Sequence, residues 1–130
     1  MVSRRPDRFV LDAGALISFE RNKRATVALV QRIVEHGGLM AVPAGVLAQV
    51  WRDGRHQARL ARLLASDCCE VVPLDDRGAR EAGQLLGVTG TSDVVDATVV
   101  RCARRRELAV ITSDRQDLRR LDQVVRLIPV

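Results

Sequence analysis

Short apolar runs alternate with segments of helical periodicity along the whole chain, and this alternation constrains the fold more than any other feature. The expected strands are 8–11, 39–42, 70–74, 108–112 and, at an edge of the sheet, 124–128. Apolar residues spaced three to four apart indicate helices between them, at 13–19, 26–34, 44–51, 57–65, 79–86, 91–105 and 116–121. Such alternation is typical of βαβ units, so we expect an α/β fold with a mostly parallel central sheet of about five strands.

The size of the chain fits a single domain over residues 1–130, and its 47% hydrophobic content is enough for a core. No apolar stretch approaches the ~20 residues needed to span a bilayer. The segment Met1–Arg5 leads into the first strand without the apolar region of a signal peptide. We therefore expect a cytoplasmic protein.

The cysteines and histidines lack the spacing of a metal site. Cys68, Cys69 and Cys102 form no Cys-x-x-Cys pair, and neither His36 nor His56 has a ligand companion nearby. Cys102 lies on an apolar helical stripe, where it is expected to be buried as a small hydrophobic residue. A zinc site and a disulfide framework are both disfavoured.

Basic residues outnumber acidic ones by 21 to 16, which gives a net charge of +5. All of the basic residues except Lys23 are arginines, and arginine pairs with phosphate in a bidentate manner. This balance favours a nucleic acid as the partner, and a merely solvated arginine-rich surface is the alternative.

Several aspartates stand where predicted strands end or helices begin. Asp12 follows the first strand, Asp114 follows 108–112, and Asp93 and Asp96 open the helix before it. Because the carboxyl ends of strands in an open α/β sheet line one crevice, these side chains should converge there. Crowded carboxylates repel each other until protons or a divalent cation neutralise them, and oxygen-only ligands select Mg²⁺ or Mn²⁺.

Helix capping is the structural alternative for these acids. The pair Asp93 and Asp96 and the pair Asp114 and Asp117 each lie at a predicted helix start, where carboxylates commonly accept hydrogen bonds from the first turn. For Asp75 and Asp76 the capping role is preferred. Asp12 adds weight to the site because small residues such as Gly14 follow it and allow close approach.

Four segments resemble, in order, the motifs of PIN-domain nucleases, and most closely those of VapC-like ribonuclease toxins. They are 10–16, 42–51, 91–97 and 112–118. The resemblance implies a three-layer α/β/α sandwich and a Mg²⁺- or Mn²⁺-dependent endoribonuclease that hydrolyses RNA phosphodiester bonds. It also implies a homodimer and a cognate antitoxin as protein partner.

The resemblance also assigns roles to the acids. Asp12 matches the first family acid and Asp96 the third, with Asp93 just upstream, and either Asp114 or Asp117 matches the fourth. We expect Asp12, Asp96 and Asp114 to lie closest to the metal ion. Asp93 and Asp117 then alternate between ligand, water-orienting and capping roles.

One position departs from the family pattern, since Gln49 stands where the second motif usually has glutamate. Its amide oxygen can still accept a hydrogen bond, but it brings no charge and no general base. We expect a metal site with reduced affinity, because Mg²⁺ needs only one or two carboxylates together with waters and substrate phosphate. The alternative is a PIN-fold interaction module that has lost activity.

Other acid-containing α/β folds match the sequence less well. A phosphoacceptor receiver domain needs a lysine after the last strand, and Lys23 is the sole lysine. A haloacid-dehalogenase-like phosphatase needs a second aspartate where Gly14 stands. Aromatic residues are limited to Phe9, Phe19 and Trp51, so recognition of RNA is expected to depend on backbone charge and RNA shape rather than on base stacking.

Overall fold

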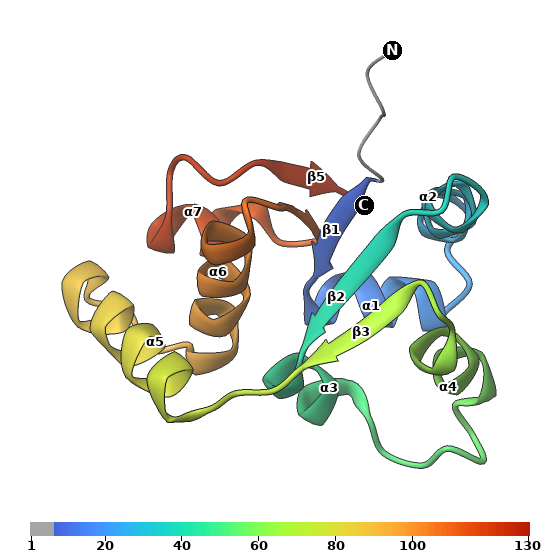
Figure 1. Cartoon of the computed structure of the whole chain (residues 1–130), viewed down its shortest axis with the longest axis horizontal. Coiled ribbons are helices and arrows are strands. Elements are labelled where there is room, and N and C mark those ends of the chain that lie inside the picture. Colours follow the sequence, from blue (N-terminus) through green and yellow to red (C-terminus); the bar gives the residue numbers. More distant parts are fainter. Residues whose placement is uncertain (1–6) are drawn as a thin grey trace.

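A computed structural model describes residues 7–130 and shows one five-stranded sheet in the order β3-β2-β1-β4-β5 (Figure 1). All neighbouring strands are parallel. Their bounds are β1 Arg8–Leu11, β2 Leu39–Pro43, β3 Cys69–Val72, β4 Ala109–Thr112 and β5 Leu127–Pro129. The expected α/β class is confirmed. The segment 1–6, in which the sequence shows no signal-peptide pattern, lies outside the described residues.

The strand order reverses beside β1. The chain moves from β1 to β2 and β3 on one side, then returns to place β4 against the other side of β1. Ligands of open α/β sheets bind beyond the carboxyl ends of the strands at such a switch point. The fold therefore directs attention to the residues that follow β1 and β4.

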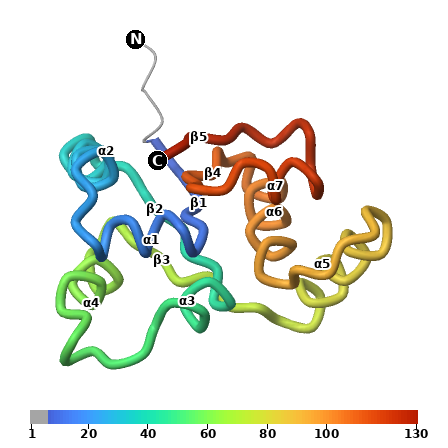
Figure 2. The backbone as a smooth tube through the Cα atoms, turned by 180° about the vertical axis from the view of Figure 1, so that it is seen from behind, coloured from blue at the N-terminus to red at the C-terminus, as the bar shows by residue number. Residues whose placement is uncertain are grey.

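Helices cover both faces of the sheet, as the two opposite views show (Figures 1 and 2). One side carries α1, α2 and α4, while α6 packs against β1, β2 and β4 on the other and α5 and α7 pack against α6. The helices are α1 Ala13–Glu20, α2 Arg24–Glu35, α3 Ala44–Val50, α4 Ala58–Ala65, α5 Asp76–Thr89, α6 Val94–Arg106 and α7 Arg115–Leu121. This arrangement confirms the three-layer α/β/α sandwich.

The core lies around the three central strands. Their apolar side chains are at most 1% exposed at Val10, Leu11, Met40, Val42, Val110 and Ile111. Strands covered on both faces read as continuous apolar runs, which is why the sequence indicated them so clearly. Cys102 is buried in the same core, as expected for a small hydrophobic residue. Within residues 7–130, no helix combines the length and apolar character needed to cross a bilayer.

Two strands differ in extent from the prediction. The last strand was expected over 124–128 but begins at Leu127, because Asp122 Oδ1 accepts hydrogen bonds from the Val124 N–H (2.6 Å) and the Val125 N–H (2.9 Å) and holds this stretch in a turn. Its position at the edge of the sheet is confirmed. The third strand ends at Val72, before Pro73, which has no N–H to donate to a neighbouring strand.

Helix α5 is longer than expected. The sequence predicted a helix over 79–86 followed by a turn at Gly87–Gly90, whereas α5 begins at Asp76 and continues through Gly87 to Thr89. The helix ends at Gly90, whose φ of +70° is a left-handed conformation that glycine adopts without steric cost. Asp75 has the expected structural role, since its Oδ1 accepts a hydrogen bond from the Gly78 N–H at 2.7 Å.

Candidate active site

Asp12 lies between β1 and α1 at the switch point of the sheet. It is the N-cap residue of α1, where its Oδ1 accepts a hydrogen bond from the Ala15 N–H at 2.8 Å. Its backbone N–H continues the pairing with β4 through a 3.2 Å hydrogen bond to the Ile111 carbonyl. Only 5% of the residue is exposed, and this burial raises the pKa of its carboxyl. The chain thus holds a rigid, nearly buried carboxylate at the carboxyl end of the central strand.

Thr112 connects the ends of β1 and β4. Its fully buried hydroxyl hydrogen-bonds to the Asp12 carboxylate, and the same Oγ1 accepts a hydrogen bond from the Asp114 N–H at 2.8 Å. One side chain therefore fixes two of the predicted site acids relative to each other. The sequence reasoning did not select Thr112, although a polar residue closing a buried apolar strand directly before an aspartate is a recognisable signal.

Gly14 allows the first turn of α1 to approach the β4–α7 turn closely. A Cβ placed on Gly14 would lie 1.8 Å from Ser113 Oγ and 3.0 Å from Ser113 Cβ. Real Cβ atoms do not tolerate the first of these distances. The expectation that small residues after Asp12 permit close approach is therefore confirmed, and the group that approaches is Ser113.

Asp93 and Asp96 occupy the start of α6. The N-cap residue is Asp93, whose Oδ1 accepts a hydrogen bond from the Asp96 N–H at 2.9 Å, so the helix begins at Val94 and not at 91 as expected. Asp96 lies in the first turn. The capping role that the sequence left open for one member of this pair thus falls to Asp93, and the Asp96 carboxylate is left for other contacts.

The second pair follows the same pattern at the start of α7. Asp114 is the N-cap residue, and its Oδ1 accepts a hydrogen bond from the Asp117 N–H at 3.2 Å. A side-chain hydrogen bond with Asp114 and the charge of that residue raise the pKa of Asp117. Asp117 also forms an exposed ion pair with Arg120, between Arg120 Nη1 and Asp117 Oδ1 at 3.6 Å.

These acids influence one another electrostatically, and we call them the acid cluster: Asp12, Asp93, Asp96, Asp114 and Asp117. Desolvation, followed by the negative charges of the other four members, raises the pKa of Asp96 to about 7. The charge of Asp114 also contributes to the raised pKa of Asp12. Acids from three separate segments of the chain therefore share one negatively charged site at the carboxyl edge of the sheet.

The donor set of the acid cluster fits a hard divalent cation in atom type and in charge. It offers carboxylate oxygens only, which Mg²⁺ and Mn²⁺ prefer, and its mutual repulsion is relieved by positive charge. Within residues 7–130, however, no group of three or more His, Cys, Asp or Glu side chains lies close enough to hold an ion. The predicted ligands Asp12, Asp96 and Asp114 thus share one edge without forming a closed coordination set.

Gln49 lies on the exposed side of α3, the helix that follows β2. This helix packs against both α1 and α6, which carry members of the acid cluster. A Cβ on Gly45 would lie 3.7 Å from Val95 Cγ2, next to Asp96. The second predicted motif is therefore adjacent to the start of α6, and its glutamine adds no charge there.

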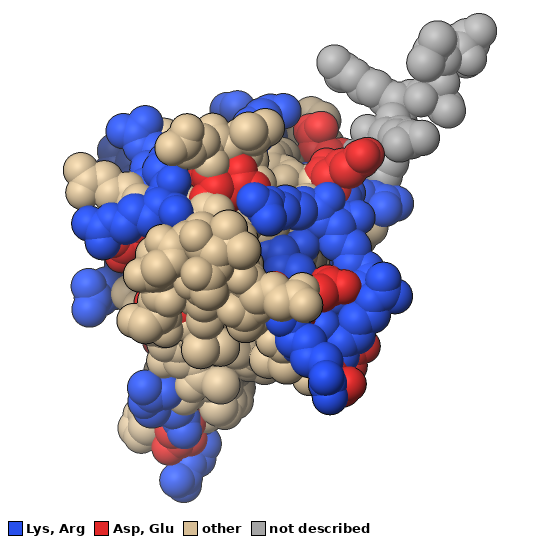
Figure 3. Space-filling model, turned by 90° about the vertical axis from the view of Figure 1, so that its left-hand side faces the viewer, with Lys and Arg blue, Asp and Glu red and all other residues tan. Residues whose placement is uncertain are grey.

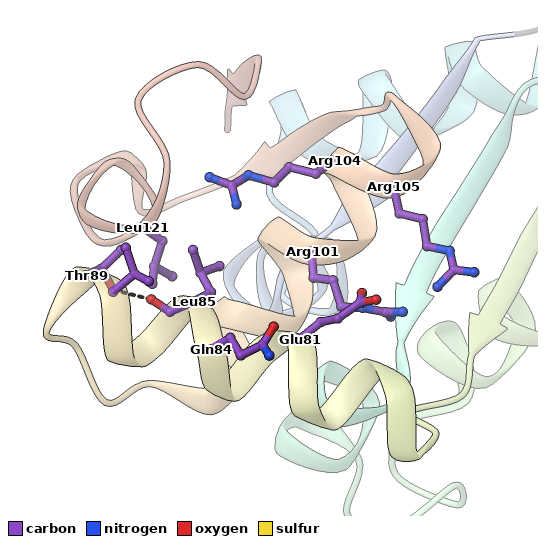
Figure 4. Close-up of a pocket in the computed structure, with 9 residues that line it drawn as sticks. Glu81, Gln84, Leu85, Thr89, Arg101, Arg104, Arg105 and Leu121 are labelled. Atoms are coloured by element: carbon purple, nitrogen blue, oxygen red, sulfur yellow. Dashed lines mark hydrogen bonds and ion pairs between the residues drawn. The ribbon is translucent and has the colours of Figure 1, made fainter.

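A cavity of about 540 Å³ lies elsewhere, between α5, α6 and α7 (Figure 4). Its charged groups are largely paired: Arg101 Nε donates to Glu81 Oε2 at 2.5 Å, and Arg104 pairs with Asp122. None of its lining residues belongs to the acid cluster, and the nearest of them on α6, Arg101, is five positions beyond Asp96, about 7.5 Å along the helix axis. This cavity is therefore separate from the acid cluster.

Comparisons with known proteins agree with this fold. A model of the PIN domain matches residues 9–124, and no curated protein matches the chain. The structure of VapBC2 from Rickettsia felis, bound to a DNA fragment from their promoter, has a TM-score of 0.73 and 13% identity, covering 95% of this chain and 98% of that one.

Two structures from Mycobacterium tuberculosis are also similar. VapBC-5, a member of the VapBC family of toxin–antitoxin systems, is 27% identical with a TM-score of 0.57, covering 96% of this chain and all of that one. VapC20, described as a sarcin–ricin loop cleaving toxin, is 16% identical with a TM-score of 0.61, covering 78% of this chain and 86% of that one.

Proposed function

The chain belongs to the PIN-domain family, and from this membership we propose that it is a Mg²⁺- or Mn²⁺-dependent endoribonuclease, the toxin of a toxin–antitoxin pair. The observation that carries the proposal is the acid cluster, in which desolvation of Asp96, followed by the negative charges of the other four aspartates, raises the pKa of Asp96 to about 7. The negative charges around Asp96 favour a bound cation. PIN-domain proteins are nucleases, and the similar VapC20 is described as a sarcin–ricin loop cleaving toxin.

The protein's residues would prepare the site for hydrolysis in distinct ways. Asp12, Asp96 and Asp114 would hold the cation, while the caps at Asp93 and Asp114 keep the starts of α6 and α7 fixed at the edge of the sheet. When bound, a divalent cation supplies positive charge that stabilises the phosphoryl oxygens and makes an attacking water more acidic. Asp117, half-buried beside Asp114, would orient that water or accept its proton.

Positive charge elsewhere on the surface supports a polyanionic substrate. On the face that carries α5, α6 and α7, arginine side chains border an uncharged area (Figure 3). The net charge of +5 exists despite the acid cluster. A basic surface around a small acidic site draws a nucleic acid in through its phosphates and leaves the reaction to the cation.

The direct test is cleavage of a set of structured and unstructured RNAs with Mg²⁺, with Mn²⁺ and with a chelator. We expect cleavage that the chelator abolishes and that Asp12→Asn and Asp96→Asn reduce at least about 1,000-fold, since each variant removes a cation ligand. Equal inactivity of wild type and variants on all RNAs would favour the second candidate, an interaction module inactivated by Gln49.

The protein partner in this proposal is an antitoxin, because similar structures include a toxin–antitoxin complex from Klebsiella pneumoniae and a member of the VapBC family of toxin–antitoxin systems. The surface we propose for this contact is a groove of about 580 Å³ between α2 and α4, which is mainly apolar and has arginines at its edge. Its lining includes Phe19, Val27, Val30, Val34, Leu63, Arg59 and Arg62. We further propose that the protein acts in the cytoplasm as a homodimer of single-domain chains.

A charge placed in this groove tests the antitoxin contact. Val34 is 42% exposed, so Val34→Glu should leave the fold intact and weaken antitoxin binding at least about tenfold by calorimetry, since the carboxylate loses water on binding. Val88→Glu, on α5 outside the groove, is the matched control. Equal antitoxin affinities of the two variants would exclude the groove as the binding surface for the antitoxin.

A further inference from the structure

Trp51, the only tryptophan of the chain, is partly exposed at the end of α3 that lies away from the start of α6. It is the C-cap residue of α3, and 37% of it is exposed to solvent. The other end of α3 packs against the start of α6 near Gly45, and six residues separate Gly45 from Trp51, about 9 Å along the helix axis. The loop that continues from Trp51 leads away from α6 to α4 (Figure 1).

Buried hydrogen bonds fix this loop, residues 51–57. Gln57, only 8% exposed, donates from Nε2 to Glu20 Oε1 and to the Val50 carbonyl, both at 2.9 Å. Its Oε1 accepts from the N–H groups of Arg52 (2.7 Å) and Asp53 (3.0 Å). One buried amide therefore ties the loop to α1 and to the end of α3, so the loop is a preorganised surface.

Gly54 lets the loop backbone lie against the indole. A Cβ on Gly54 would lie 3.2 Å from Trp51 Cζ2 and 3.3 Å from Cη2, closer than most side chains tolerate. The benzo ring is thus supported by the loop, while 37% of the residue is exposed to solvent. Exposing the largest aromatic side chain on a rigid support is unfavourable for the free protein, and it is typical of a surface that binds a partner.

Two arginines follow Trp51 in the same loop. Arg52 Nη1 donates to the backbone carbonyls of Ala48 (3.3 Å) and Trp51 (2.6 Å), which holds its guanidinium at the C-terminal end of α3. The Arg55 side chain is 88% exposed and meets Asp53 only at 3.5 Å, so it remains available to a ligand. Proteins that hold single-stranded nucleic acids combine aromatic side chains with basic groups in this way.

We propose that Trp51 and loop 51–57 form a platform on which an unpaired RNA base stacks, with Arg52 and Arg55 contacting the adjoining phosphates. This inference rests on the proposed function and specifies its substrate: RNA that has an unpaired base at a distance from the cleaved bond, since paired bases are already stacked inside a helix. It also revises the expectation from composition that base stacking plays no part in recognition.

The single tryptophan provides its own probe. In the cleavage-deficient Asp96→Asn protein, oligouridylate should quench tryptophan emission, whereas an abasic oligonucleotide of equal length should bind in a salt-dependent way and quench it little. In the same background, Trp51→Leu should raise the Kd for oligouridylate at least about fivefold, and Trp51→Phe, which keeps an aromatic ring, should raise it less. Equal thermal midpoints of these variants would show that folding is unaffected.

The outcomes separate this inference from the proposed function. If wild type cleaves RNA and Trp51→Leu leaves Kd and KM unchanged, the platform is overturned and the ribonuclease stands. If no RNA is cleaved but base-dependent quenching occurs and Trp51→Leu weakens binding, the platform stands and the ribonuclease fails. If Trp51→Leu binds RNA normally but loses antitoxin affinity, the surface is a protein contact and the platform is overturned.

Discussion

Two regions of the molecule use the same local device with different results: the acid cluster and the start of α5. Asp12, Asp93 and Asp114 each cap a helix by accepting a hydrogen bond from the N–H three residues ahead, at 2.8, 2.9 and 3.2 Å, and Asp75 caps α5 in the same way at 2.7 Å. The first three share one edge of the sheet, whereas Asp75 is exposed at a helix that packs on α6 and α7. An aspartate at a helix start therefore indicates a cap. It indicates a candidate site only where several such aspartates converge at one edge of the sheet.

The largest expected effect tests this contrast directly. Asp114→Asn and Asp75→Asn both keep a side-chain oxygen that can cap, so both proteins should unfold at similar temperatures. Asp114→Asn should lower RNA cleavage at least about 100-fold because it removes a carboxylate from the proposed cation site, whereas Asp75→Asn should leave it unchanged. A comparable loss in both variants would mean that the cap itself, rather than convergence, supports activity.

The sequence predicted the parts of this contrast that follow from pattern. Continuous apolar runs marked the buried strands, and the expectation that the carboxyl ends of parallel strands line one crevice brought Asp12 toward Asp114. The strand order that sets β4 beside β1 came only from the structure. Local pattern did not reveal which acid of a pair caps its helix. That choice depends on whether one carboxylate, such as that of Asp93, lies in line with the N–H of the first turn.

Contacts between distant residues also escaped prediction. Thr112 joins two site acids through hydrogen bonds. Gln57 fixes loop 51–57 through a hydrogen bond to Glu20, which lies 37 residues earlier in the sequence. Neither residue has a spacing pattern of its own. Trp51 was counted with the scarce aromatics, and only its exposure on a rigid loop gives it a candidate role.

Two glycines give the second contrast. Gly14→Ala should destabilise the protein by about 1–2 kcal/mol and lower cleavage at least about tenfold, because the new methyl group displaces Ser113 and with it the turn that carries Asp114. Gly87→Ala meets no atom within 4 Å on α5 and should stabilise the protein by about 0.5–1 kcal/mol. Chemical denaturation and initial cleavage rates measure both effects. If Gly14→Ala changed neither stability nor cleavage, the first turn of α1 and the β4–α7 turn would be free to separate.

The pH dependence of the metal-free protein is the third test. Because the pKa of Asp96 rises from its ordinary value of 3.8 to about 7 on folding, the folded state binds the extra proton, and the stability this provides is lost as pH rises through 7. We expect the free energy of unfolding in chelator to fall between pH 5 and 8. Asp96→Asn should flatten this slope and stabilise the protein at pH 8 by about 1–2 kcal/mol, less than the full shift because solvent reaches the site.

Thermal unfolding across this pH range, with Asp75→Asn as the matched variant, separates the two regions. Asp75→Asn should keep the wild-type slope, because its carboxylate is outside the acid cluster. Addition of Mn²⁺ at pH 8 should restore the lost stability in wild type, since the cation takes the place of the proton. A wild-type slope that survives Asp96→Asn would assign the titration to another group.

The smallest expected effect concerns the one position where a family carboxylate is missing. Gln49→Glu adds negative charge to α3 beside the start of α6, so Mn²⁺ should bind the free protein about five- to tenfold more tightly, measured by calorimetry at pH 8. Gln84→Glu makes the same chemical change on α5, beside the arginine-lined cavity, and should leave Mn²⁺ affinity unchanged. If Gln49→Glu also leaves it unchanged, position 49 lies outside the ion's field, and the proposal that Gln49 weakens metal binding is wrong. If both variants raise it equally, net charge rather than convergence governs the affinity, and the contrast between the acid cluster and the α5 region does not extend to cation binding.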